Sequence, residues 1–494
     1  MLLGEVLIAN GFVSRADVEA ALARQRESGG VLGENLIALG SMSEEALRRA
    51  MQLAPAEPRN LAETGLSERF LLNLLLKVMF VRALETPSEL AEAVRLPAGI
   101  LEPVLRFARE NGLVTVVGST GNGMLVELRH ELTSEGRRQA VDQLGRSQYA
   151  GPAPVSMASY IWQIERQHIT NERVARSSLA AMLAHLVLPE SLVEELGPAV
   201  NSARAMLLYG PPGSGKTSIA EAMGRSFKDK VYIPHAIELD GQVITVFDPA
   251  LHVPAEPSHY GRDKDVQAPL LRESIDARWV LCRRPTVMAG GELQLQMLDL
   301  RFSTETGVYE APLQIKAMNG IFIIDDFGRQ RADPRALLNR WILPLDKRFD
   351  FLQLHTGLKF RVPFDVLIVF STNLAPEDLM DEAFLRRIPY KIHVGAPSAE
   401  QYAEIFRRAC EANGIEIPRA LLASLLRDFY AKNHQPLGSY HPAFLIDRVM
   451  DACRYRGTTP VLDERELRLA WRNLFVQRTE GAGSGNGRGT HLAA

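Results

Sequence analysis

The sequence has few features of a secreted, membrane-spanning or disulfide-linked protein. Its 494 residues include three cysteines, Cys282, Cys410 and Cys453, and no CxxC pair. That spacing supports neither a disulfide framework nor a zinc site. A run of about 18 apolar residues, the length that a membrane-spanning helix needs, is absent from the sequence. The first residues also lack the basic stretch that opens a signal peptide, so we expect a cytoplasmic protein.

An excess of charge of either sign is missing as well. The formal net charge is -3, so the chain as a whole has no basic field that would attract nucleic acid or an anionic membrane. Apolar residues make up 46% of the chain and charged residues 23%, which is usual for globular proteins. At roughly 100–200 residues per domain, the length favours about three or four domains.

Residues 1–53 contain an internal repeat with an offset of 29 positions (33 minus 4). The repeated positions include Gly4 and Gly33, Gly11 and Gly40, and Ser14 and Ser43. Each copy predicts a short helix, a glycine turn, and a second amphipathic helix that begins after a serine cap. We therefore expect a small α-helical repeat domain.

Residues 64–145 predict a winged helix, which is an α+β fold. Three apolar helical segments come first, and Thr86 with Glu89 predicts a capping box at the start of the second. Two alternating strands follow, joined by the glycine-rich residues 118–123, and a last helix closes the segment. Acidic and basic side chains are nearly balanced here, so we expect this domain to dock to a protein; DNA is the alternative.

Residues 157–395 alternate strands with helices, as in a parallel α/β sheet. An apolar strand that ends at Tyr209 leads into a glycine-rich loop, and a helix starts directly after it. This is the G-x-x-x-x-G-K-[ST] pattern in the strand–loop–helix context that binds nucleotide phosphates. The predicted nucleotide-binding residues are Gly210, Pro211, Pro212, Gly213, Ser214, Gly215, Lys216, Thr217 and Ser218.

The residue types in this loop predict Mg-ATP as the ligand. Backbone N–H groups and the helix N-terminus attract phosphates. We expect Lys216 to reach the β- and γ-phosphates and the Thr217 hydroxyl to bind Mg²⁺.

Two further strands end in polar residues that would complete a hydrolysis site. One apolar strand ends in Asp325 and Asp326, and a later one ends in Asn373. Open α/β sheets bind ligands at the carboxyl ends of their strands. We expect Asp325 to hold the Mg²⁺ shell, Asp326 to polarise the attacking water, and Asn373 to contact the γ-phosphate or that water. Many such ATPases carry glutamate at the second position, so the rate that the shorter Asp326 supports stays open.

In this order, the motifs of residues 169–457 resemble the AAA+ ATPase module. The resemblance implies a ring, usually of six subunits, with ATP sites between neighbours. Residues 381–387 resemble its arginine-finger segment, which implies that Arg387, or alternatively Arg386, reaches the γ-phosphate held by the next subunit. Residues 396–478 would form the helical lid, in which the sensor-2 residue is not identified. Residues 479–494 are rich in glycine and poor in apolar side chains, which predicts disorder.

The stretch between Lys216 and Asn373 leaves room for inserted hairpins. Turns at Asp240-Gly241, Thr306-Gly307 and Thr356-Gly357 predict three of them, over residues 231–247, 290–312 and 349–364. The last two resemble the hairpins of MoxR-type ATPases and sigma-54 activators. That resemblance implies that they face the ring pore and grip a protein partner.

The amino-terminal repeat resembles the N-terminal domain (MshEN-type) of type II secretion and pilus-extension ATPases, several of which bind cyclic di-GMP. Leu2 and Val31 stand where those domains usually carry an arginine. Without that cation we expect a dinucleotide anion to bind weakly. A small helical docking module is the alternative.

Three functions are therefore open at this stage. The first is an ATPase that remodels or regulates a protein partner. The resemblance of the amino-terminal repeat suggests that this partner belongs to a secretion or pilus system. The second is an ATP switch that controls assembly, with slow hydrolysis and a response to cyclic di-GMP. The third is a DNA-binding ATPase that acts through the winged helix.

Overall fold

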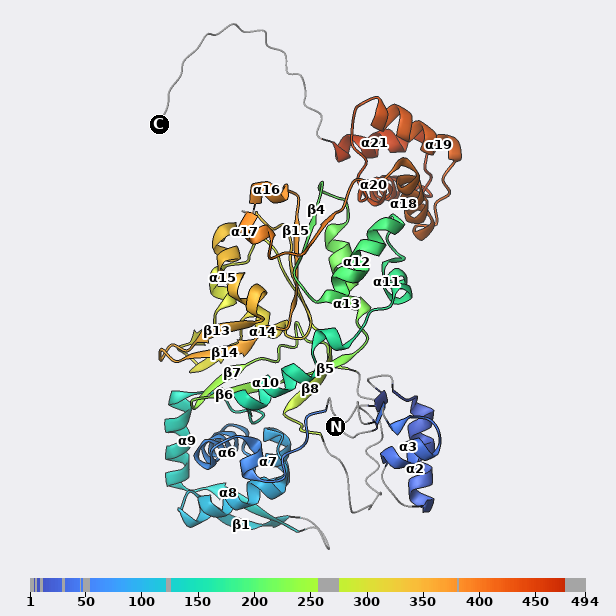
Figure 1. Ribbon diagram of the computed structural model, residues 1–494. Coiled ribbons are helices and arrows are strands. Elements are labelled where there is room, and N and C mark those ends of the chain that lie inside the picture. The colour runs from blue at the N-terminus through green and yellow to red at the C-terminus, as the bar shows by residue number, and fades with distance from the viewer. Residues whose placement is uncertain are drawn as a thin grey trace, which may run out of the picture. The chain divides into compact units, whose positions relative to one another are not determined.

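The computed structural model describes residues 4, 7–8, 12–28, 32–44, 46–47, 54–120, 126–255, 275–379 and 382–475 (Figure 1). Contacts divide the chain into two compact units. The core unit comprises Met1–Ala184, Glu190–Tyr209 and Thr217–His393, and the lid unit comprises His185–Pro189, Gly210–Lys216 and Val394–Ala494. Leu2, Val31 and the predicted disordered tail lie outside the described residues.

The amino-terminal repeat has matching packing in its two copies. Its described helices are α2 (Arg15–Ser28) and α3 (Leu32–Ala38). A Cβ added to Gly4 would come 2.9 Å from Val18, and one added to Gly33 would come 2.6 Å from Leu47. Val18 and Leu47 are separated by the same offset of 29 positions (47 minus 18). Gly4 and Gly33 thus have the same structural role, because a Cβ at either position would force the facing side chain to move.

Residues 61–146 fold as helices with a β-hairpin, in the order expected from the sequence. The elements are α5 (Leu61–Thr64), α6 (Glu68–Arg82), α7 (Pro87–Val94), α8 (Ala98–Glu110), β1 (Val114–Thr120), β2 (Glu127–Leu132) and α9 (Ser134–Arg146). The predicted capping box of Thr86 and Glu89 is present. The strands are antiparallel and pair from Val114 with Leu132 to Thr120 with Glu127.

A five-stranded parallel sheet forms the centre of the core unit, which confirms the predicted α/β fold (Figure 1). The strand order is β16 (Tyr390–His393), β4 (Met206–Tyr209), β15 (Leu367–Thr372), β12 (Ile321–Ile324) and β9 (Thr286–Ala289). Every residue of β12 and β15 is buried, which accounts for their uninterrupted apolar sequences. Because parallel strands end at one edge, the residues that follow β4, β12 and β15 leave the sheet on the same side.

Helices cover both faces of this sheet, with α12 and α13 on one face and α15 on the other (Figure 1). The helices of this region are α10 (Met157–Arg166), α11 (Arg176–Leu183), α12 (Glu190–Ser202), α13 (Lys216–Ser226), α14 (Leu313–Lys316), α15 (Pro334–Lys347), α16 (Pro376–Leu379) and α17 (Glu382–Leu385). Trp341 of α15 is fully buried, and its ring lies 5.6 Å from that of Phe322 and 5.8 Å from that of Phe370. This packing holds α15 against β12 and β15. Trp279 is buried as well, so both tryptophans belong to the core.

The inserted strands differ in part from the predicted hairpins. A second sheet has the order β10 (Arg301–Ser303), β11 (Val308–Glu310), β7 (Gln242–Thr245), β6 (Ala236–Leu239) and β3 (Val155–Ser156). The first predicted hairpin, over residues 231–247, is shorter than expected, because only β6 and β7 pair around Asp240-Gly241. The other two turn where predicted: β10 and β11 pair around Thr306-Gly307, and β13 (Phe349–Gln353) and β14 (Lys359–Pro363) around Thr356-Gly357.

The strand that precedes β6 has a distant partner. β5 (Lys230–Pro234) pairs antiparallel with β8 (Trp279–Arg283). The physical reason is burial: Val231 and Leu281 both lie in the main hydrophobic core, so pairing with β8 covers apolar side chains of both strands.

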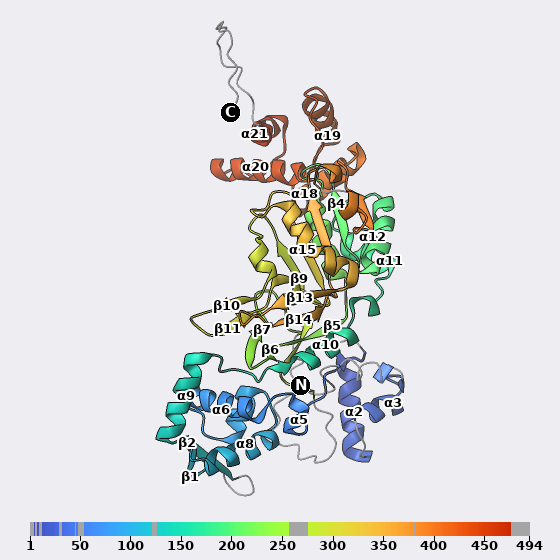
Figure 2. The ribbon, with the colours of Figure 1, turned by 60° about the vertical axis from the view of Figure 1, so that its left-hand side comes forward.

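The carboxyl-terminal part of the lid unit is helical, as predicted (Figure 2). Its elements are α18 (Ala399–Ala412), α19 (Arg419–Ser424), a π-helix (Leu425–Ala431), α20 (His441–Arg456) and α21 (Glu464–Leu474). Cys410 and Cys453 are buried free thiols of this unit, and Cys282 is buried in the core unit. Among the helices of the described ranges, none has the length and apolar character needed to cross a bilayer.

Candidate nucleotide-binding and hydrolysis site

The predicted phosphate-binding loop connects β4 to α13. Gly210, Gly213 and Gly215 have φ values of +148°, +74° and +93°, which side chains with a Cβ rarely adopt. Lys216 is almost fully buried, and its Nζ donates to the carbonyl oxygens of Gly210 at 3.1 Å and Pro211 at 2.9 Å. The ammonium group is thus held inside the loop that a phosphate would occupy.

The remaining loop residues differ in exposure. Ser214 is buried, Pro211 and Pro212 are exposed, and Ser218 is partly buried at the start of α13.

Thr217 and Asp325 meet directly, as a shared magnesium site would need. The Thr217 hydroxyl donates to Asp325, with Oγ1 2.9 Å from Oδ2 and 3.0 Å from Oδ1. These residues are 108 positions apart, so the parallel sheet brings them together. A hydroxyl and a carboxylate are hard oxygen ligands, and the pair fits Mg²⁺. Clusters of three or more metal-ligating His, Cys, Asp or Glu side chains are not found among the described residues.

Asp326 and Asn373 are also in contact. Asn373 Nδ2 donates to Asp326 Oδ1 at 2.9 Å. Asp326 is exposed, and its backbone has a φ of +48°. The next residue, Phe327, donates its N–H to the Ser371 carbonyl at 2.7 Å, which ties the end of β12 to β15. This hydrogen bond between the strand ends helps to place the Asp326 carboxylate beside the Asn373 amide.

The two arginine-finger candidates each contact a carboxylate of their own chain. Arg386 is exposed and directly follows α17, and its Nη2 lies 2.9 Å from Glu382 at the start of that helix. Arg387 Nε donates to Asp346 Oδ2 on α15 at 2.8 Å. Sequence reasoning missed Asp346, because no local motif connects the end of α15 with residue 387.

Among the described residues of the lid unit, the arginine contacts found do not identify a sensor-2 residue. Among its described residues, Arg448 pairs with Asp451 at 3.0 Å on the same helix. His441 begins α20 and is buried, and burial lowers its pKa to about 4. The lid residues that do contact the loop are Ser439 and Tyr440, at Gly213. No sequence signal marks them.

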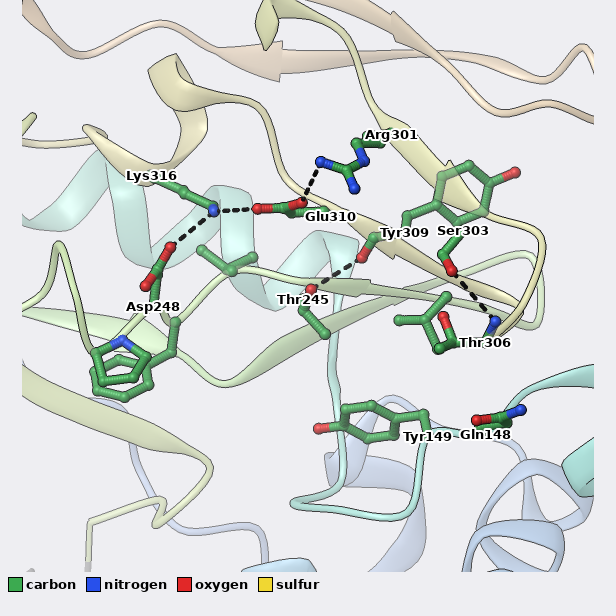
Figure 3. Close-up of a pocket in the computed structure, with 14 residues that line it drawn as sticks. Gln148, Tyr149, Thr245, Asp248, Arg301, Ser303, Thr306, Tyr309, Glu310 and Lys316 are labelled. Carbon is green, nitrogen blue, oxygen red and sulfur yellow. Dashed lines mark hydrogen bonds and ion pairs between the residues drawn. The ribbon is translucent and has the colours of Figure 1, made fainter. Parts of the chain in front are cut away.

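A cavity of about 590 Å³ lies beside the inserted hairpin of β10 and β11. Figure 3 shows Tyr149, from the linker after α9, across the cavity from Thr245 of β7. The charged side chains that line the cavity pair with one another: Lys316 Nζ lies 2.9 Å from Asp248 and 2.6 Å from Glu310. The cavity therefore lies between the linker and the second sheet, and these charges already have partners.

The turn of this hairpin rests on the same linker. Gln148 donates its N–H to the Thr306 carbonyl at 2.7 Å and its Nε2 to the Glu305 carbonyl at 3.0 Å. A Cβ added to Gly307, whose φ is +62°, would come 2.1 Å from the Arg146 carbonyl oxygen. These contacts place the turn against the end of α9 within the chain. Whether the hairpin faces a ring pore, as the sequence resemblance implies, stays a prediction.

The two inserted hairpins contact each other through aromatic side chains. The His355 ring stacks on Phe302 at 4.1 Å, and the His355 N–H donates to the Tyr309 hydroxyl at 2.9 Å. A path of direct contacts thus runs from α9 through both hairpins.

Two family models match segments of the chain. Residues 206–252 match the ATPase family associated with various cellular activities (AAA). Residues 398–473 match a domain of unknown function (DUF8689). No curated protein matches the chain.

Solved structures give only remote likeness. NtrX from Brucella abortus is 16% identical, with 55% of this chain and 51% of that chain covered and a TM-score of 0.35. NtrX in complex with ATP is 15% identical, covers 69% and 64%, and has a TM-score of 0.36. A RuvB mutant from Thermotoga maritima is 13% identical, covers 62% and 72%, and has a TM-score of 0.32. The chain thus spans between half and two thirds of these NtrX chains, and TM-scores this low establish no shared fold.

The AAA match begins at β4 and includes the loop and α13. Together with the parallel sheet, it supports the assignment of this part of the chain to the AAA ATPases.

Proposed function

We propose that this protein is a Mg-ATP-binding AAA+ ATPase that hydrolyses ATP. The contact between Thr217 and Asp325, 2.9 Å apart, carries the proposal. It joins the end of the P-loop motif to the end of β12, and both residues are of the type that binds Mg²⁺.

Each residue has a distinct part in the proposed reaction. Lys216 would turn from the loop carbonyls to the β- and γ-phosphates, while Thr217 and Asp325 would hold Mg²⁺, which neutralises phosphate charge when bound. Asp326 would orient and polarise the attacking water. Its hydrogen bond to Asn373 supports a joint role, because the amide fixes the carboxylate in one rotamer.

We further propose that the active protein is a ring, with six subunits as the first expectation. Arg387 would leave Asp346 and reach the γ-phosphate on the neighbouring subunit, with Arg386 as the alternative. The exposed pairs that hold both arginines are weak in water, so such an exchange costs little.

The partner is proposed to be a protein. Phe351 and Leu358 of the β13–β14 hairpin are exposed apolar residues, which supports docking of a polypeptide there. Residues 64–145, proposed as a winged helix, and the amino-terminal repeat would add docking surface. DNA binding by the winged helix, cyclic di-GMP binding by the repeat, and a role in a secretion or pilus system are the alternatives.

Phosphate release and MgATP binding test the proposed function together. Lys216→Ala is expected to lose binding, while Asp325→Ala and Asp326→Asn lose turnover with circular dichroism spectra like that of the wild type. Binding without turnover in the wild-type protein would refute the ATPase and leave the ATP switch. Wild-type turnover that survives Asp325→Ala would refute the site.

A further inference from the structure

Two neighbouring lid residues hold one edge of the phosphate-binding loop. The Ser439 N–H donates to the Gly213 carbonyl oxygen at 2.9 Å. The Tyr440 ring lies against the same glycine, since a Cβ added to Gly213 would come 2.3 Å from Tyr440 Cδ1 and 2.5 Å from Cε1. Gly213 is therefore required both by its φ of +74° and by the ring that covers it.

The hydrogen bond from Ser439 sets the direction of one peptide group. Among the described residues no peptide is cis, and in a trans peptide the C=O and N–H point in opposite directions. With the Gly213 oxygen directed to Ser439, the Ser214 N–H points away from the lid helix. Backbone N–H groups of this loop type are the groups that bind phosphates. A flipped peptide would present a carbonyl oxygen to the anion instead.

The segment that presents Ser439 and Tyr440 is itself closely packed. The Gly438 N–H donates to His441 Nδ1 at 3.1 Å, and that nitrogen lies 3.0 Å from the Tyr430 hydroxyl. A Cβ added to Gly438 would come 2.7 Å from His441 Nε2, so this position also requires glycine. The start of α20 thus has a defined position from which to hold the loop.

We propose that Ser439 and Tyr440 are positioning residues for the nucleotide phosphates. They keep the Gly213–Ser214 peptide in the orientation that offers the Ser214 N–H to phosphate, and the Tyr440 ring blocks the space into which Gly213 would move. Nucleotide affinity then depends on contact between the loop and the two residues that precede α20. The inference rests on the proposed ATPase function and adds a lid contact made by a ring and a backbone N–H rather than by a cation.

Substitution of Tyr440 in the full chain tests this role. Tyr440→Ala should raise the KM for MgATP and the Kd for MgADP about tenfold, with kcat changed much less. Tyr440→Phe should stay near the wild type, because the ring and not the hydroxyl touches Gly213. Tyr455→Ala is the matched control, since Tyr455 lies near the far end of α20, the helix that Tyr440 precedes, and is 92% exposed.

A second set of variants separates this contact from general damage to the loop. Gly213→Ala should weaken nucleotide binding, and adding Tyr440→Ala should restore part of it, because the new methyl group no longer meets the ring. Gly215→Ala should gain nothing from Tyr440→Ala, since a Cβ there has no neighbour within 4 Å.

Two results would overturn the proposal: wild-type KM and Kd in Tyr440→Ala, or equal recovery of both glycine variants. A wild-type protein that binds no MgATP would refute the proposed function itself, which is a separate outcome.

Discussion

Asp326 has a backbone φ of +48°, in the left-handed region that residues with a Cβ rarely adopt. Its side chain is exposed, so burial does not compensate for that conformation. Such a conformation costs roughly 1 kcal/mol or more, and strain of this kind collects at functional sites. The proposed role in water activation gives a reason for keeping a carboxylate at this position.

Replacement of Asp326 should therefore separate stability from activity. Asp326→Gly is expected to raise the free energy of unfolding by about 0.5–1 kcal/mol, because glycine adopts the left-handed region at little cost. Both Asp326→Gly and Asp326→Asn should lose ATP turnover, but Asp326→Asn should not gain stability. Urea unfolding and phosphate release measure the two effects, and a destabilised Asp326→Gly would contradict the account.

His441 should make the lid unit sensitive to acid. Burial lowers its pKa from 6.5 to about 4, so between these values the unfolded chain binds more protons than the folded one. The stability contribution of neutral His441 is complete above pH 6.5 and decreases as the pH falls toward 4. The loss is at most about 3 kcal/mol.

The matching experiment is urea unfolding of the wild type, His441→Phe and His434→Gln at pH 7, 5.5 and 4.5. The pH-dependent loss of stability should be smaller in His441→Phe, whatever its stability at pH 7. His434 is exposed in the same unit, so His434→Gln should follow the wild type. Identical pH profiles for all three proteins would exclude His441 as the source.

At the scale of elements, the turn of the inserted β10–β11 hairpin packs against the end of α9 and the linker that follows it. Gln148 makes two hydrogen bonds to its turn. On the other side of the linker, the buried Lys77 of α6 donates to the Ser147 carbonyl at 3.1 Å. The linker is thus held from both directions, by residues 61–146 and by the hairpin.

Gly307→Ala should break this attachment more than a turn glycine elsewhere would. Its new methyl group would meet the Arg146 carbonyl at 2.1 Å, in addition to a left-handed penalty of about 1 kcal/mol. Gly241→Ala, in the β6–β7 turn, has a φ of +75° and no neighbour within 4 Å, so it carries the backbone penalty alone. Gly307→Ala should lower the melting temperature further and speed proteolysis near Gln148. Equal effects of both changes would show that the contact contributes no stability.

The sequence predicts elements whose information lies in adjacent residues. The loop from Gly210, the pair Asp325–Asp326 and the hairpin turns are of this kind, because turn and loop conformations depend on local residues. Pairings between distant segments cannot be predicted from adjacent residues. Examples are β5 with β8, Arg387 with Asp346, and Tyr440 with Gly213. Each of them depends on how segments far apart in the sequence pack in the folded chain.

At the scale of the whole molecule, the proposed ring gives the contact between Arg387 and Asp346 a function. In the single chain Arg387 Nε donates to Asp346 at 2.8 Å, on the surface of α15. A neighbouring γ-phosphate would compete for the same guanidinium and offers more charge than one carboxylate. Asp346 would thus hold the Arg387 side chain in one orientation until a neighbouring subunit with bound ATP is present.

The central claim is that two subunits complete one ATP-hydrolysing site. The most direct measurement is phosphate release by the wild type, Asp326→Asn, Arg387→Ala and an equimolar mixture of the two variants, with particle mass followed by light scattering. Each variant alone should be inactive, and the mixture should regain about a quarter of the wild-type rate, because random mixing pairs an intact Asp326 with an intact Arg387 at one interface in four. A wild type without phosphate release, or mixed assemblies as inactive as either variant, would contradict the account.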